Sequence, residues 1–196
     1  MNVIDMLVKQ SGKPTGVIGR IMLKVMNHVD SGLNKQMLNK INFPEAIGLE
    51  IGCGGGESAN RLLLNRKLSK IIGLDVSSDA IKVSNKKNVK MVIDGKAEFI
   101  DGYVESLPFE NDCFDVVYAI RSHYFWEDLE KGLREIHRVL NDGGNLFIFS
   151  ELFKIKYHMD RFNNDESIRN LLIEIGFKNV EIENTRNTQC LFATKI

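Results

Sequence analysis

The stretch from Ala46 to Gly56 (AIGLEIGCGGG) constrains the fold of this chain more than any other. Its apolar run ends abruptly at Gly52, as a buried strand does where the chain turns. The glycines that follow let the backbone turn tightly and approach a ligand without a Cβ in the way. From Glu57 onward the apolar spacing indicates a helix. A strand, a glycine loop and a helix N-terminus together form an edge typical of nucleotide binding, although a glycine loop taken alone is also compatible with a tight turn that binds nothing.

The spacing of the glycines narrows the class of ligand. A dinucleotide fingerprint requires G-x-G-x-x-G, but the position for its third glycine holds Glu57, and the third glycine falls at Gly56. Glu50 stands two residues before Gly52. A carboxylate there repels a pyrophosphate and suits a ligand with an ammonium or sulfonium group. A nicotinamide-dependent oxidoreductase is therefore the weaker alternative.

Composition limits the partners that the chain can have. The 196 residues favour one domain with a full core, and 26 Lys and Arg residues balance 26 Asp and Glu residues. A net charge of zero argues against a general nucleic-acid or membrane-surface binder, although a local basic patch is compatible with it. The three cysteines lack C-x-x-C spacing, so neither a disulfide framework nor a metal site is indicated. The N-terminus does not resemble a signal peptide, and no apolar run approaches a membrane span, so we expect a cytoplasmic protein.

Strand and helix patterns alternate along the chain. Strands are predicted at residues 46–51, 70–76, 97–101, 114–120, 145–150, 180–182 and 190–194. Helices are predicted from residue 57, from Ser77 or Ser78 to residue 83, over 127–140 with an end at Asn141–Gly144, and over 167–175. This alternation predicts an α/β fold: a mainly parallel sheet with helices on both faces, closed by an antiparallel hairpin.

The residues before the first strand are predicted to be helical. Residues 17–29 carry a broad apolar stripe at helical spacing, and a second helical stretch covers 33–41. We expect residues 1–45 to form either a helical cap on the sheet edge or a lid over the ligand, and residues 46–196 to form a single compact unit.

Several candidate binding residues follow the ends of predicted parallel strands. In such sheets ligands bind outside the carboxyl ends of the strands. The glycine loop, Asp75, the loop at 102–106 and the loop at 121–126 all fall at that edge. Asp75 follows Gly52 by 23 residues, close to the offset at which an acid accepts hydrogen bonds from ribose hydroxyls. The convergence predicts one site.

Four stretches carry a resemblance to a known family: residues 49–56 (LEIGCGGG), 73–77 (GLDVS), 105–109 (ESLPF) with Phe114 and Asp115, and 134–144 (REIHRVLNDGG). In this order they resemble the class I S-adenosylmethionine (SAM)-dependent methyltransferases. The resemblance covers residues 46–150, and the tail is similar to the family's closing hairpin. It implies a Rossmann-like, seven-stranded sheet and SAM as the cofactor.

The resemblance also implies roles for individual residues. The methionine portion of SAM would be held by Glu50, Gly52, Cys53, Gly54 and Gly56. Asp75 would bind the ribose hydroxyls, Val76 would lie against the adenine, and Val104 and Glu105 would lie along its edge. Ile120 or Arg121 would offer backbone to the SAM amino group. Tyr103 stands where the family often carries an acid that accepts from the adenine amino group, so its hydroxyl or a backbone carbonyl would have to substitute.

The aromatic loop after the fourth strand supplies the catalytic candidates. His123 is the first candidate for a base, because imidazole titrates near neutral pH, and Tyr124 is the second catalytic candidate. The alternative is a loop histidine that only packs beside the cofactor. Tyr124, Phe125 and Trp126 would either wall a flat apolar substrate or seal the sheet edge.

The same loop bears on the acceptor. No Asn/Asp-Pro-Pro-Tyr/Phe motif follows the fourth strand, which weighs against the family's exocyclic-amine methylators of DNA. The short segment 151–166 leaves little room for a macromolecule-binding domain. We therefore expect a methyltransferase that acts on a small molecule, similar in kind to the quinone-biosynthesis group, with no nucleic-acid or membrane partner. A non-catalytic SAM-binding protein is the alternative.

Overall fold

The computed structural model describes residues 32–196. The strands are β1 (Ile47–Ile51), β2 (Lys70–Asp75), β3 (Ala97–Asp101), β4 (Phe114–Ile120), β5 (Leu140–Glu151), β6 (Lys178–Asn184) and β7 (Thr188–Thr194). The α-helices are α3 (Gly32–Lys40), α4 (Glu57–Leu64), α5 (Ser78–Lys87), α6 (Val89–Ile93), α7 (Leu129–Val139), α8 (Leu152–His158) and α9 (Asp165–Ile175). Two short 3₁₀ turns are η1 (Val104–Ser106) and η2 (His123–Phe125).

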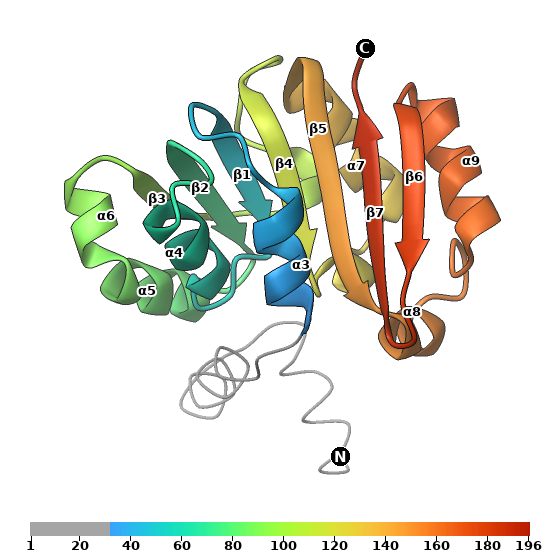
Figure 1. The fold of residues 1–196 in the computed structure, drawn as a ribbon, viewed down its shortest axis with the longest axis horizontal. Coiled ribbons are helices and arrows are strands. Elements are labelled where there is room, and N and C mark those ends of the chain that lie inside the picture. Colours follow the sequence, from blue (N-terminus) through green and yellow to red (C-terminus); the bar gives the residue numbers. More distant parts are fainter. Residues whose placement is uncertain (1–31) are drawn as a thin grey trace.

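The described strands form one seven-stranded sheet in the order β3-β2-β1-β4-β5-β7-β6 (Figure 1). Strands β1 to β5 pair in parallel, while β7 runs antiparallel to both β5 and β6. The carboxyl ends of the parallel strands therefore meet at one edge, which is the lower edge in Figure 1. The expected α/β fold with its closing hairpin is confirmed.

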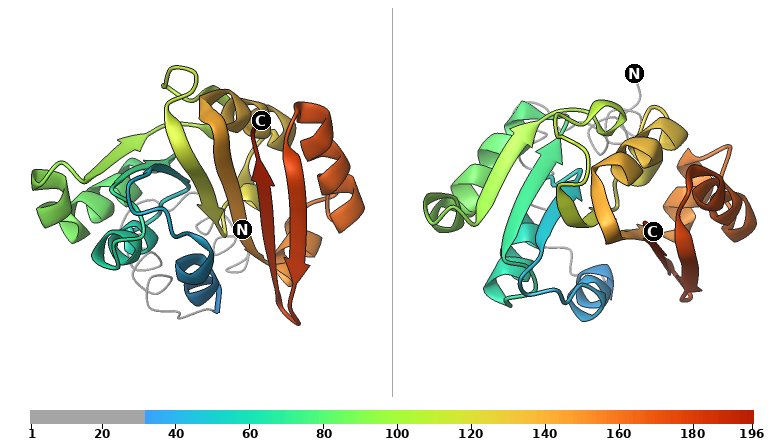
Figure 2. Two further views of the ribbon diagram at one scale, coloured as in Figure 1. Left: turned by 45° about the horizontal axis from the view of Figure 1, so that its top comes forward. Right: turned by 90° about the horizontal axis from the view of Figure 1, so that it is seen from above.

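Helices cover the sheet on both faces (Figures 1 and 2). One face buries Leu33 and Met37 of α3 together with Leu62 of α4 against β4 and β5. The other face buries apolar residues of α7 and α9, among them Leu133 and Leu171. The sheet thus lies between two apolar clusters, one on each face. This packing holds the strands in place, and with them the edge at which the loops after the parallel strands meet.

The chain departs from the expected pattern between α7 and β5. We predicted that Asn141–Gly144 would end the helix as a loop, but α7 ends at Val139 and β5 begins at Leu140. The reason lies in the C-terminus of the chain: Gly143 donates its N–H to Lys195 O over 2.8 Å, and Lys195 donates to Gly144 O over 3.0 Å. Partners distant in sequence draw the glycine turn into the strand.

Other differences concern helices. Helices α6 and α8 were not predicted. The predicted cap of α5 is present: Ser77 Oγ accepts a hydrogen bond from the N–H of Ala80 over 3.3 Å. The second N-terminal stretch is the helix α3. The predicted helix at 17–29 lies outside the described residues.

Candidate functional site

The glycine loop adopts a conformation that side chains disfavour. Gly52, Gly54 and Gly56 have φ of +73°, +52° and +71°, in the left-handed region that glycine enters at no steric cost. The N–H groups of Gly52 and Cys53 both donate to Leu74 O, over 2.8 and 3.0 Å. A Cβ at Gly52 would lie 2.4 Å from Ser122 Cβ. The loop is thus pinned between the ends of β2 and β4.

Asp75 ends β2 and faces this loop. Its Oδ2 accepts the N–H of Gly54 over 2.8 Å, and its Oδ1 accepts the N–H of Ser77 over 2.9 Å. Burial raises the pKa of Asp75, and the two backbone hydrogen bonds oppose that rise. A carboxylate has about four acceptor positions, so each oxygen keeps capacity for another donor.

Glu50 lies beneath the loop and is only 2% exposed. It accepts hydrogen bonds from Ser58 Oγ and from Tyr118 Oη, the latter over 3.2 Å. Burial raises the pKa of Glu50 to about 8, although these two hydrogen bonds act to lower it. The group therefore gains or loses its charge close to neutral pH, and a nearby cation would favour the charged form.

Cys53 and the residues after β3 line the same edge. Burial raises the pKa of the Cys53 thiol well above its usual value, so the thiol stays protonated at neutral pH. Val104 is buried in η1, whereas Tyr103 before it is exposed. Glu105 Oε1 accepts the N–H of Asp128 over 3.2 Å. Val76, after Asp75, is half-buried.

The end of β4 places Ile120 and Arg121 beside the loop. Ile120 is half-buried, and Arg121 has a φ of +56° and donates its N–H to Phe149 O over 2.9 Å. The Arg121 guanidinium forms an ion pair with Glu151, with 3.2 Å between Nε and Oε1. A ligand ammonium donates hydrogen bonds, so the backbone group that could bind it at this point is a carbonyl and not the Arg121 N–H.

His123 and Tyr124 lie in η2 and are both buried. His123 Nδ1 lies 3.0 Å from Ser150 Oγ, and burial lowers the pKa of the imidazole to about 3. The ring is therefore neutral at pH 7. Tyr124 donates its hydroxyl to Glu151 Oε2 over 3.3 Å, and burial together with this carboxylate raises the pKa of the phenol.

Residues 49–148 match the model of the methyltransferase domain family, which covers just over half of the chain. This chain belongs to the class I SAM-dependent methyltransferases. The resemblance inferred from the sequence, and with it SAM as the cofactor, is confirmed by the family match.

Two curated relatives of this methyltransferase illustrate the similarity. The Sterol 4-C-methyltransferase strm-1 of Caenorhabditis elegans is 27% identical over 77% of this chain and 45% of its own length. The phthiotriol/phenolphthiotriol dimycocerosates methyltransferase of Mycobacterium leprae is 31% identical over 61% of this chain and 43% of its own length. The chain thus spans less than half the length of these two relatives.

Solved structures agree on the fold. A SAM-dependent methyltransferase from Aquifex aeolicus has a TM-score of 0.72 at 16% identity, covering 89% of this chain and 97% of its own. Phosphoethanolamine N-methyltransferase 2 of Haemonchus contortus, solved with SAM, has a TM-score of 0.71 at 18% identity, covering 83% of this chain and 52% of its own.

The donor set of this methyltransferase fits SAM. The glycine loop brings backbone close to the edge without side chains, and Asp75 keeps acceptor capacity for two hydroxyls. The buried Glu50 is a carboxylate whose ionisation a sulfonium or ammonium would favour.

Sequence reasoning missed Glu151, which ends β5 at the same edge. Glu151 contacts Arg121 at 3.2 Å, Tyr124 at 3.3 Å and Lys154 at 3.8 Å. The signal that could have found it is its position as the first acid after the predicted strand 145–150, at the same edge as Asp75.

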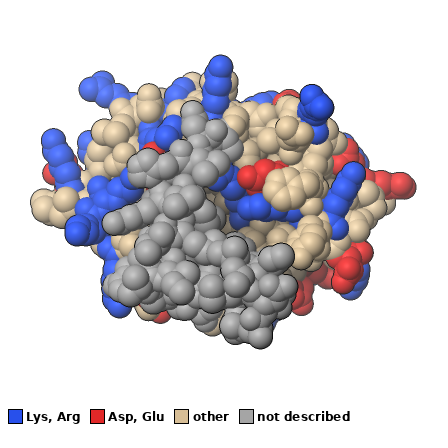
Figure 3. Space-filling model, turned by 90° about the horizontal axis from the view of Figure 1, so that it is seen from below, with Lys and Arg blue, Asp and Glu red and all other residues tan. Residues whose placement is uncertain are grey.

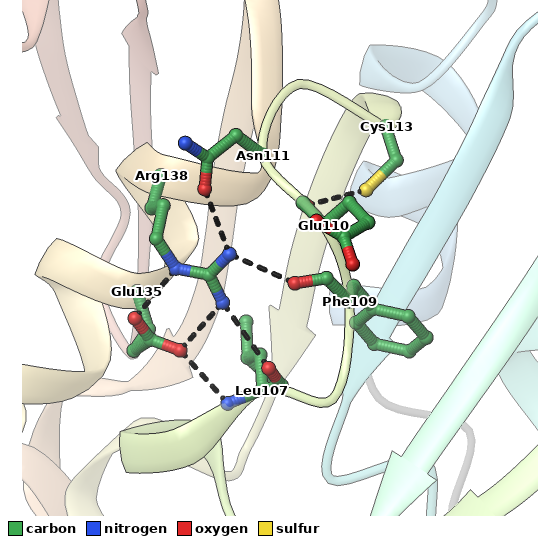
Figure 4. Close-up of polar contacts among 7 residues, drawn as sticks. All are labelled: Leu107, Phe109, Glu110, Asn111, Cys113, Glu135 and Arg138. Atoms are coloured by element: carbon green, nitrogen blue, oxygen red, sulfur yellow. Dashed lines mark hydrogen bonds and ion pairs between the residues drawn. The ribbon is translucent and has the colours of Figure 1, made fainter.

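Sequence reasoning also missed how the loop after η1 is held (Figure 4). Arg138 of α7 donates to the carbonyls of Leu107 and Phe109 over 3.1 and 2.8 Å, and to Asn111 Oδ1 over 3.0 Å. Glu135 holds the guanidinium through two hydrogen bonds and accepts the Leu107 N–H over 2.9 Å. The loop that follows the residues proposed to lie along the adenine is thus attached to α7.

Metal ligation and membrane crossing find no support in the described part of the chain. In residues 32–196, no group of three or more His, Cys, Asp or Glu side chains is placed to hold a metal ion. No helix within that range has the length and apolar character needed to cross a membrane.

Proposed function

We propose that this chain transfers the methyl group of SAM to a small-molecule acceptor. The observation that carries the proposal is the contact between Asp75 and the Gly54 N–H, because it assembles two separate strand ends into one cofactor edge. When bound, SAM supplies an electrophilic methyl group on a sulfonium. Aligning an acceptor with that methyl and excluding water can contribute on the order of 7–11 kcal/mol.

We assign each part of the cofactor to its own group of residues. Asp75 holds the ribose hydroxyls, and Val76, Tyr103, Val104 and Glu105 surround the adenine. The loop residues Gly52, Cys53, Gly54 and Gly56 approach the methionine portion, and Ile120 or Arg121 accepts from its amino group through a backbone carbonyl. Glu50 acts through the negative potential of its ionised form, which the sulfonium or ammonium of the bound ligand favours.

His123 and Tyr124 are the proposed catalytic residues. The neutral imidazole of His123 is the form that accepts a proton, and its low pKa makes it a weak base. The Tyr124 hydroxyl is oriented by Glu151.

We further propose that residues 1–45 form a helical cap or lid on a domain of residues 46–196. Part of this segment, α3, packs its buried Leu33 and Met37 onto the sheet.

The choice of a small-molecule acceptor is supported by the short connection between β5 and α9, which holds only α8. The names of both curated relatives include small-molecule acceptors, a sterol and the phthiotriol dimycocerosates. Apolar hydroxylated compounds are therefore the first panel to test.

Titration calorimetry with SAM and S-adenosylhomocysteine, followed by methyl transfer from labelled SAM to that panel, tests the proposal. We expect micromolar binding of both and transfer to at least one acceptor. Binding without transfer to any acceptor would favour a non-catalytic SAM-binding protein, and the absence of binding would reject the site.

A further inference from the structure

Helix α8 presents two aromatic rings to solvent. Phe153 is 66% exposed and Tyr157 is 70% exposed. They stand four positions apart, so both rings lie on one face of the helix. Ile155, on the opposite face, is buried against the protein. The exposed pair therefore contributes nothing to the apolar core.

Cations flank this aromatic pair. On a helical projection Lys154 lies to one side of the pair and Lys156 to the other. Lys156 is exposed and Arg161 follows the helix, whereas Lys154 is half-buried, with its Nζ 3.8 Å from Glu151 Oε2 and 5.7 Å from the centroid of the Tyr124 ring. Residues 152–162 contain three Lys or Arg residues and one acid, Asp160, in a chain whose net charge is zero. The basic character is local.

The helix also lies at the edge where the proposed cofactor site opens. Helix α8 follows β5 directly, at the carboxyl end of the parallel strands (Figure 1). Viewed onto that edge, Lys and Arg atoms lie on both sides of the grey residues, and Asp and Glu atoms gather toward the right of the view (Figure 3). A surface that contacts α8 would therefore face the acceptor side of the molecule.

We propose that α8 docks this protein on the surface of an anionic phospholipid bilayer. Aromatic rings sit favourably at the level of the lipid headgroups, and each Lys or Arg near an anionic surface adds attraction. Two aromatics between lysines match that boundary in both polarity and charge. Docking does not depend on the proposed methyl transfer; if both hold, the acceptor is an amphiphile taken from the bilayer.

Co-sedimentation of the full chain with lipid vesicles tests the proposal. Phosphatidylcholine vesicles are compared with vesicles that also contain phosphatidylglycerol. We expect the partition coefficient to be about tenfold higher on the anionic vesicles, and to fall as salt is added. The variant Phe153→Ser with Lys156→Glu should lose about tenfold of that binding.

A matched control lies on α6. Ile93 is 79% exposed and Lys90 is exposed on the same helix, so Ile93→Ser with Lys90→Glu makes a comparable change elsewhere: one exposed apolar residue becomes Ser and one Lys becomes Glu. We expect this variant to bind vesicles like the wild type. SAM binding by each preparation, measured by calorimetry, shows that it is folded.

Four results would overturn the docking proposal: no vesicle binding, equal binding to neutral and anionic vesicles, equal losses in the α6 and α8 variants, or binding to an acidic protein but not to vesicles. The last of these results would point to a protein partner for α8 and would count against docking on lipid. Each leaves the methyltransferase proposal standing, since SAM binding and methyl transfer are measured without lipid.

Discussion

The backbone N–H of Gly54 donates to Asp75 Oδ2 over 2.8 Å, so the acid that ends β2 holds the loop that follows β1. The other oxygen of Asp75 accepts the N–H of Ser77 and fixes the start of α5. One carboxylate thus organises two backbone segments and keeps acceptor capacity for a ligand.

Replacing Asp75 by Asn should weaken SAM binding by about tenfold to a hundredfold, because a charged acceptor of ligand hydroxyls is lost. The new amide also meets a backbone N–H donor, which lowers the free energy of unfolding by about 1–3 kcal/mol. Calorimetry and urea denaturation measure the two effects. Asp101→Asn is the matched control, since Asp101 ends β3 opposite Asp75 and is exposed. Equal losses of SAM affinity in both variants would contradict the assignment.

Replacing Gly52 by Ala should destabilise the loop more than a positive φ alone does. Left-handed backbone costs a non-glycine residue about 1–2 kcal/mol. The clash with Ser122 Cβ, 2.4 Å from the new Cβ, should add about 1–3 kcal/mol. Gly143→Ala isolates the first cost, because Gly143 has a φ of +78° and a Cβ added there would meet no heavy atom of the described residues within 4 Å. Denaturation midpoints that are equal for the two variants would rule out the clash.

Glu50 should make folding stability fall as pH rises from about 4.5 to 8. Its pKa rises from 4.5 to about 8 on folding, so in this window the folded state holds a proton that the unfolded chain has lost. Stability then decreases by up to about 1.4 kcal/mol per pH unit. Glu50→Gln removes this dependence, so the unfolding free energy of the wild type minus that of the variant should decline across the window. A constant difference would show that Glu50 is already ionised at its lower end.

His123 should remain neutral between pH 5 and pH 8, because burial lowers its pKa to about 3. Its imidazole NMR signals should not shift over this range in the folded protein, whereas the unfolded chain should titrate near the usual value of 6.5. If the neutral ring accepts the acceptor's proton, His123→Asn should lower kcat by about a hundredfold with little change in SAM affinity. A loss of kcat below about threefold would exclude base catalysis by this residue, because a general base contributes at least about 10²-fold to the rate.

Arg138→Lys should lower the free energy of unfolding by about 1–2 kcal/mol, because an ammonium cannot reproduce the bonds to Glu135 and to two loop carbonyls. Arg134 lies one turn earlier on α7 and forms ion pairs with two exposed acids, Glu130 and Glu174. Arg134→Lys should therefore change stability by less than about 0.5 kcal/mol. Urea denaturation of both variants provides the comparison, and similar losses would show that the loop carbonyls contribute little.

The pattern along the chain was sufficient to locate the strands of the sheet, apart from the start of β5, and the sheet edge at which the candidate residues lie. Apolar runs that end in glycine or acid, as at Gly52 and Asp75, identify buried parallel strands and their carboxyl ends, because both the strand and its end are encoded within a few neighbouring residues. The parallel order then brings those ends together without further information.

Long-range packing accounts for what the pattern missed. Glu50 meets Tyr118, 68 positions away, and Gly143 meets Lys195 at the far end of the chain. The pKa of about 8 at Glu50 and of about 3 at His123 arise from burial, which the assembled sheet and helices create. Local sequence sets which residues stand at the edge; their charge states and hydrogen-bond partners depend on groups that are neighbours only in the folded chain.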